Sequence, residues 1–253
     1  HLARLGFSSL QIGTIVAGTL LGSAVLTTTV GLLSHRLDPR RVLLASSVLM
    51  LATGLGFGVL GTFWPLLIVA MVGTLNPSAG DVSVFLPTEQ ALLAEANAAE
   101  RPALFARYNV AGSIAGALGA LASAGPALVA ARTGVDVATA ERMTFLLYGA
   151  IGLASGFVYA GLPAAARPVI AARRRPLARS RRIVLQLAAL FSLDSFGGGF
   201  VVQTLLVLWL SRRFALPVET MGAVFFAAGI FSAISQLASP RLAARIGLVP
   251  TMV

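Results

Sequence analysis

The chain has 253 residues, of which 57% are hydrophobic and only 11% are charged, and its mean hydropathy is +0.88. This composition excludes a soluble domain with a solvated surface and places the protein in a lipid bilayer. The formal net charge of +10 would indicate a nucleic acid partner if the protein were soluble. Here the arginines gather in the gaps between apolar runs, as is typical of membrane loops, so we expect membrane lipids and no nucleic acid among the partners.

Cysteine is absent, and histidine occurs only at His1 and His35. A disulfide framework and a thiolate metal site are therefore excluded, and two histidines are too few for a histidine-based site. The nucleotide-binding pattern G-x-x-x-x-G-K-[ST] is also absent, so the chain does not encode ATP drive. We expect no metal and no cofactor. All 19 basic residues are arginine, a bias that is typical of a GC-rich genome and favours the inner membrane of a bacterial cell.

Seven apolar runs are predicted to cross the membrane as helices, because one crossing needs about 20 apolar residues. The uncharged run 42–80 is roughly twice that length, and the turn residues and interfacial aromatic of 61–65 divide it into two spans. The predicted fold is therefore all-α, a polytopic membrane protein. The predicted spans are 10–33, 42–61, 65–86 with an amphipathic extension to 94, 108–131, 143–162, 183–210 and 220–238.

The arginines between these runs orient the predicted spans. One set of loops holds 14 arginines, and the loops on the other side hold 5. By the positive-inside rule the first set is cytoplasmic, which puts residue 1 outside and residue 253 in the cytoplasm. Loop 164–182, with seven arginines and two prolines, is expected to link two halves of the protein. The arginine-rich loops are 34–41, 95–107, 164–182 and 240–247.

The charged turn between the first two predicted spans resembles a loop of the major facilitator superfamily. It reads G-L-L-S-H-R-L-D-P-R-R-V-L over residues 31–43, and the family pattern between its second and third spans is G-x-L-A-D-R-x-G-R-R-x-x-L. The departures are His35 for the usual Asp, Asp38 for Gly and Pro39 for Arg. The residues that fit are Gly31, Leu33, Ser34 in place of Ala, Arg36, Arg40 and Leu43.

An internal repeat with an offset of 209 residues supports this resemblance. It carries the first predicted span and the charged turn onto the last predicted span and the segment 240–247. A parallel repeat of this kind is typical of transporters built from two six-helix halves. The matched pairs are Gly13 with Gly222, Ser23 with Ser232, Ala24 with Ala233, Leu33 with Leu242 and Arg36 with Arg245.

The resemblance implies a major facilitator-type helical bundle, of which this chain covers spans 2 to 8 of 12. Residues 1–163 would form the N-terminal six-helix half without its first span, 164–182 the central cytoplasmic loop, and 183–253 the first spans of the C-terminal half. It also implies a secondary active transporter, monomeric at full length, that moves a small molecule by alternating access with coupling to H+ or Na+. Export and import both stay open, as does the substrate.

Asp194 is the foremost candidate for substrate binding or ion coupling. It lies near the middle of the predicted span 183–210, where a carboxylate is costly and is by default a functional candidate. Ser195 and the run 197–199 of three glycines follow it, which favours a bend or local unwinding beside the carboxylate. Gln203 on the same span completes this set. The alternative is a glycine packing notch with Asp194 bonded to a neighbouring helix.

A polar stripe runs along the predicted span 65–86. Its positions are spaced by 4, 3, 4 and 3 residues, which places them on one helical face. Such a stripe faces a cavity or another helix rather than lipid, and the resemblance makes this the fourth span, which lines the central cavity of the family. Asn76, Ser83 and the neighbouring Asp81 are therefore substrate or ion candidates. The stripe consists of Asn76, Gly80, Ser83, Pro87 and Gln90.

Four charged residues near the predicted cytoplasmic ends are candidates for gating. Arg36 and Arg40 are expected to pair with acidic partners or with helix C-terminal carbonyls when the cytoplasmic side is closed. Arg245 is the repeat counterpart of Arg36, and Glu89 lies near the cytoplasmic interface. The alternatives are plain topology signals for the arginines and a solvated or loop-bonded carboxylate for Glu89.

Small residues on the predicted span 108–131 admit two interpretations. The pair Gly125-Pro126 resembles a G-P motif of the antiporter branch of the family, although its neighbouring glycines are missing. The preferred interpretation is that the glycines of this span allow close contact with another helix. These glycines are Gly112, Gly116, Gly119 and Gly125.

Two other function classes compete with a transporter. An intramembrane enzyme would need a nucleophile with a base, or a metal cluster, and the predicted spans offer no His, no Cys and no acid pair at i, i+3 or i+4. We therefore expect no catalytic residue and no enzymatic activity. A membrane sensor or scaffold that does not transport stays open as an alternative.

Overall fold

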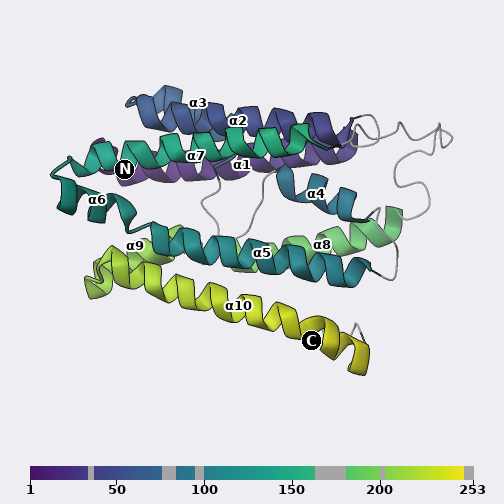
Figure 1. Cartoon of the computed structure of the whole chain (residues 1–253). Helices are drawn as coiled ribbons and strands as arrows, with labels where there is room; N and C mark the ends of the chain where they lie inside the picture. The colour runs from purple at the N-terminus through teal and green to yellow at the C-terminus, as the bar shows by residue number, and fades with distance from the viewer. Residues whose placement is uncertain (34–36, 76–83, 95–99, 163–180, 200–202, 248–253) are drawn as a thin grey trace. The chain divides into compact units, whose positions relative to one another are not determined.

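The computed structural model describes residues 1–33, 37–75, 84–94, 100–162, 181–199 and 203–247, and every regular element in these ranges is an α-helix (Figure 1). The prediction of an all-α fold is confirmed for this part of the chain. The helices are α1 (Ser9–Leu33), α2 (Pro39–Val59), α3 (Phe63–Val72), α4 (Phe85–Ala94), α5 (Arg101–Ala122), α6 (Gly125–Thr133), α7 (Val137–Ala160), α8 (Arg181–Gly199), α9 (Gln203–Phe214) and α10 (Val218–Ile246).

Five described helical segments are long and apolar enough to cross a membrane. The predicted spans 65–86 and 183–210 are not among them. In the first, α3 ends at Val72 and residues 76–83 lie outside the described ranges; in the second, α8 ends at Gly199 and α9 begins at Gln203. The described residues thus form a multi-pass helical protein, and the count of seven spans stays a prediction. The five segments are Ser9–Leu33, Pro39–Val59, Arg101–Thr133, Val137–Ala160 and Thr220–Ala238.

Proline and aspartate determine two helix ends that differ from the ends predicted from hydropathy. The predicted span 108–131 divides at 123–124, because Pro126 has no N–H for the carbonyl of Ala122 and its ring would clash there. Helix α7 begins at Val137, inside the predicted loop 132–142, where the Asp136 carboxylate accepts a hydrogen bond from the backbone N–H of Ala138 at 3.0 Å.

The last helix is also longer than its predicted span. The segment 240–247, expected to be a turn, continues α10 as far as Ile246. Alanine and leucine in this segment are strong helix formers. The helix ends where Gly247 adopts a φ of +92°, a left-handed conformation that glycine tolerates without steric cost.

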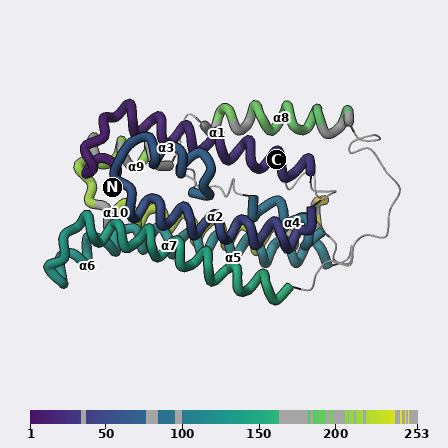
Figure 2. The backbone as a smooth tube through the Cα atoms, turned by 90° about the horizontal axis from the view of Figure 1, so that it is seen from above, coloured from purple at the N-terminus to yellow at the C-terminus, as the bar shows by residue number. Residues whose placement is uncertain are grey.

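One compact unit comprises His1–Thr88 and Glu141–Leu208, and glycines bring its helices together. Helices α2 and α7 run side by side in opposite directions (Figures 1 and 2). A Cβ added at Gly54 would lie 2.5 Å from the backbone nitrogen of Gly149, and one at Gly152 would lie 2.8 Å from Cγ of Met50. Because lipid is as apolar as the side chains, such close packing, rather than the hydrophobic effect, holds membrane helices together.

Helix α3 packs against α1 in the same unit. A Cβ at Gly22 would overlap the carbonyl group of Met71, so only glycine allows the two backbones to meet there. A small apolar core lies nearby, with each member less than one-tenth exposed. Its residues are Ile15, Phe57, Leu66 and Ala70.

The second unit comprises Glu89–Ala140 and Trp209–Val253 and contains the antiparallel pair α5 and α10, which lie side by side in Figure 1. A Cβ at Gly229 would lie 2.7 Å from Cβ of Ala117, and one at Gly222 would lie 2.9 Å from the carbonyl oxygen of Ala120. None of the four glycines of the predicted span 108–131 has a described neighbour within 4 Å of an added Cβ, so the described residues do not support the interpretation that these glycines form a close helix contact. The alanines of α5 make the close contact, opposite glycines of α10.

Candidate functional site

Three hydroxyl groups meet where α3 ends, and we call Thr53, Thr74 and Tyr148 the hydroxyl cluster. Thr53 on α2 is 1% exposed; its hydroxyl donates to the carbonyl of Leu49 at 2.6 Å and accepts from the backbone N–H of Thr74 at 3.3 Å. The hydroxyls of Thr74 and Tyr148 share a hydrogen bond of 2.9 Å. Two neighbouring helices thus hold the residues that follow α3.

Glycine is required at this point for steric reasons. A Cβ at Gly73 would lie 2.6 Å from the hydroxyl oxygen of Thr53, so a larger residue would displace the hydroxyl that receives the Thr74 N–H. In a bilayer, backbone groups released by the end of a helix need partners from the protein or from a water-filled cavity. Thr53 supplies one such partner. Discontinuous helices with neighbouring polar side chains are how transporters build binding sites.

The hydroxyl cluster is uncharged and offers both donors and acceptors. It therefore suits a polar group of a ligand rather than acid–base or nucleophilic chemistry, for which no second component is present among these residues. One of its members, Thr74, stands two residues before Asn76 in the sequence; Asn76, Asp81 and Ser83 lie outside the described residues. We take the cluster as the candidate site of this unit.

A clamp between two helix ends is a second feature of the same unit. Nη2 of Arg40, in the first turn of α2, donates to the carbonyl oxygen of Ala160, the last residue of α7, at 2.6 Å. Asp38 caps α2 by accepting from the backbone N–H of Arg40 at 3.1 Å. The expectation that Arg40 meets a helix C-terminal carbonyl agrees with this geometry, whereas its gating role stays a prediction.

An ion pair joins the segment before α1 to the start of α7. Nε of Arg4 lies 2.8 Å from Oε1 of Glu141. Since Arg40 meets the opposite end of α7, the two contacts mark the two ends of this unit. Residue 4 and residue 141 therefore share one end, and residues 40 and 160 share the other.

The other predicted site residues are only partly placed. Glu89 on α4 accepts a hydrogen bond from the hydroxyl of Tyr108 on α5. Arg245 is exposed in the last turn of α10. Asp194 and Ser195 lie in α8 and Gln203 begins α9, but their side chains, like the whole of Arg36, lie outside the described part. Among the described residues no three His, Cys, Asp or Glu side chains group as metal ligands.

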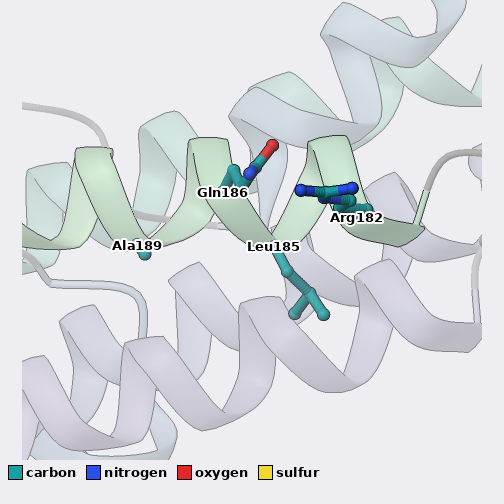
Figure 3. A pocket seen from close by; sticks show the side chains of 4 residues that line it. All are labelled: Arg182, Leu185, Gln186 and Ala189. Carbon is teal, nitrogen blue, oxygen red and sulfur yellow. The ribbon is translucent and has the colours of Figure 1, made fainter.

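A hollow of about 500 Å³ lies along α8, and Figure 3 shows the four side chains that line it. All four come from one helix at spacings of 3, 1 and 3 residues, and each is exposed. In Figure 3 Leu185 points to the opposite side of the helix from Gln186. A surface lined by a single helix does not enclose a ligand, so we do not assign it as the site. The lining residues are Arg182, Leu185, Gln186 and Ala189.

Comparison with known proteins decides the family. The sequence profile of the Major Facilitator Superfamily matches residues 2–253. The chain belongs to this superfamily. It is also 24% identical, over 274 aligned residues, to an uncharacterized membrane protein of Saccharomyces cerevisiae. The alignment covers 94% of this chain and 61% of the yeast protein, so the chain spans about 61% of the length of this relative. No solved structure matches it.

Membership of the Major Facilitator Superfamily confirms the resemblance that the charged turn indicated. The residues of the hydroxyl cluster escaped the sequence analysis, because a Thr or Ser in an apolar helix usually bonds the carbonyl four residues before it. Thr19 and Ser47 do so here, at 2.8 and 2.9 Å. Tyr148 gave no signal either, because in the predicted span 143–162 it lies near one end, where tyrosines of spanning helices gather.

Proposed function

We propose that this chain is part of a secondary active transporter that moves a small molecule across a membrane by alternating access. The observation that carries the proposal is the family match over residues 2–253, because members of this superfamily are generally transporters rather than enzymes. The composition agrees with it, as do five apolar helical segments among the described residues. The activity, substrate and partners of the whole protein are part of the proposal.

The orientation in the membrane belongs to the same proposal. We place residue 1 outside, with loops 34–41 and 164–182 in the cytoplasm, because these loops carry most of the arginines. The contact between Arg40 and Ala160 supports this placement, since it puts the end of the first loop and the beginning of the second at one end of their unit. The ion pair of Arg4 with Glu141 puts residue 4 at the opposite end.

Binding is proposed to involve the hydroxyl cluster together with the polar residues 76, 81 and 83 that follow it. Asp194 is proposed as the ion-coupling carboxylate, with H+ or Na+ as the coupling ion, since a carboxylate within a span is costly unless it serves a function. Ser195 and Gln203 are proposed to assist it. The transported molecule is a small solute with groups that hydroxyls can bind.

Two steps test the proposed function. Small molecules are first compared inside cells that lack the full-length gene and cells that overproduce its product, and the compound whose level changes most is chosen. Purified full-length protein in liposomes is then offered this compound with and without a proton or sodium gradient. We expect accumulation that depends on the gradient. A compound that crosses equally well in empty liposomes, or a protein that moves none of the changed compounds, contradicts the proposal.

A further inference from the structure

The contact between α5 and α10 contains a hydrogen-bond acceptor to which no described residue donates. Nε2 of Gln236 donates to the hydroxyl oxygen of Ser113 on α5 at 2.8 Å and to that of Ser232 on its own helix at 3.1 Å. Both of its N–H groups are thereby used. Oε1 of Gln236 is buried, and no described residue donates a hydrogen bond to it.

In the orientation that the structure has, the two N–H groups of the Gln236 carboxamide bond the serine hydroxyls, and its oxygen receives no hydrogen bond from a described residue. A buried polar group without a partner weakens the state that buries it, because the full desolvation of the group is not offset.

The rest of the contact is tightly packed. Gly229 meets Ala117 and Gly222 meets Ala120 with no room for a further carbon atom, and Met221 is 3% exposed. Close packing of small residues favours a closed pair of helices. The unpaired oxygen favours an open pair, since an amide oxygen that reaches water in a cavity regains hydrogen bonds. The same contact thus combines two opposing contributions.

We propose that Gln236 is a positioning residue that sets the balance between the closed and open states of the α5–α10 contact. Its bond to Ser113 fixes the register of the two helices, and its unpaired oxygen keeps the closed state from becoming too stable to open. This inference rests on the proposed function, because alternating access requires helix contacts that part. It assigns no contact with the substrate to Gln236.

Spin labels test the inference without any substrate. Cysteines replace the exposed Ala115 on α5 and Ala227 on α10 in the full-length protein in nanodiscs, on a background from which any cysteine outside these 253 residues has been removed; the 253 residues themselves contain none. Electron paramagnetic resonance gives the populations of short and long label distances. Gln236→Leu removes both the unpaired oxygen and the bond to Ser113, so it is compared with Ser113→Ala, which removes the bond alone. The ratio of short to long distances should be about tenfold higher in Gln236→Leu than in Ser113→Ala.

Two further variants separate the effect of the unpaired oxygen from the effect of the bond between the helices. Ser113→Ala removes the bond between the helices and leaves Oε1 in place, so it should lower the same ratio. Gln236→Met keeps the length of the side chain and should act like Gln236→Leu, which covers the case in which leucine prevents folding. A ratio in both Gln236 variants that is no higher than the ratio in Ser113→Ala shows that Oε1 does not oppose closure and overturns the inference. A wild-type protein with one distance population under all conditions overturns alternating access as well.

Discussion

Arg40 binds the carbonyl oxygen of Ala160 at 2.6 Å and so ties the first turn of α2 to the last residue of α7. The last carbonyls of a helix have no donor within the helix, and its C-terminal end carries a partial negative charge that attracts a guanidinium group. Beside Arg40, Asp38 caps the start of α2. One arginine therefore contacts two helix ends. An arginine that served only to orient its loop by positive charge would need no such contact.

Replacing Arg40 by glutamine should destabilise the protein by about 1 kcal/mol, because the carbonyl of Ala160 loses a charged donor. The free energy of unfolding in detergent measures the effect. Arg41→Gln is the matched control: its side chain is 86% exposed and its Nε lies 3.9 Å from Asp38, so its loss should cost less than about 0.5 kcal/mol. Equal losses in the two variants would mean that the clamp contributes nothing of its own.

Gly54→Ala should destabilise the unit that contains α2 and α7 by about 1 to 3 kcal/mol, because the new methyl group overlaps the backbone of α7. Gly116→Ala on α5 meets no described atom within 4 Å and should instead stabilise its helix by up to about 1 kcal/mol. Thermal unfolding of the two variants beside wild type measures both effects. A Gly54 variant as stable as wild type would show that the two backbones are not in contact.

Tyr148→Phe should weaken transport while the protein still folds. It removes one hydroxyl from the hydroxyl cluster, and the loss of one hydrogen bond with the ligand corresponds to about a fivefold to tenfold higher concentration for half-maximal uptake. Uptake into liposomes at a series of substrate concentrations measures this value. Thr29→Val is the control, since Thr29 is exposed and, among the described residues, its hydroxyl bonds the carbonyl of Val25 on its own helix. Wild-type concentration dependence in Tyr148→Phe would exclude the cluster from binding.

Reporter fusions should place position 173 in the cytoplasm and position 134 outside. Position 173 lies in the loop with seven arginines, whereas Gly134 follows α6 in a connection with few. Alkaline phosphatase and green fluorescent protein, fused in turn at each position, report the two compartments. If both positions lie on the same side, the predicted count and orientation of the spans are wrong.

Asp194→Asn should abolish transport against a gradient while leaving insertion and folding intact. Asparagine keeps the size and hydrogen bonding of the residue but cannot exchange a proton or neutralise a cation. Substrate exchange without a gradient should survive, and Asp194→Glu should retain part of the coupled activity. Both are measured as uptake of the identified compound into liposomes across a pH series. Uphill transport at the wild-type rate in Asp194→Asn would reduce the carboxylate to a packing role.

Long uncharged runs made the helices predictable, because a bilayer admits few other backbone structures. The ends of the helices were less predictable, since hydropathy does not register capping. Asp136 starts α7 within a segment that reads as a polar loop, and Pro126 divides a run that reads as one span. The capping aspartate and the proline are both visible in the sequence. Whether each one starts or ends a helix depends on the helix propensity of the residues around it.

Of the side-chain contacts in the unit that contains α2 and α7, the sequence predicted the one at Arg40, which involves charge, and not those of the hydroxyl cluster. Arg40 stands out in an apolar chain, and its partner class, a helix C-terminal carbonyl, followed from the charge at helix ends. Thr53 and Tyr148 could not be paired from sequence, because which helices are neighbours depends on the fold. The proposed roles of Asp194, Asn76 and Ser83 depend on side chains outside the described residues and stay predictions.

The glycine contact between α2 and α7 has a mechanical consequence. Where Gly54 meets Gly149, backbone faces backbone, and no side chain is present that could change its rotamer while one helix slides past the other. A shift of α7 by one residue would bring a larger side chain against α2. The two helices are therefore expected to move together as one rigid body. Bending is expected at segments such as the end of α3, where hydrogen bonds from hydroxyl groups, rather than close backbone contacts, hold the chain.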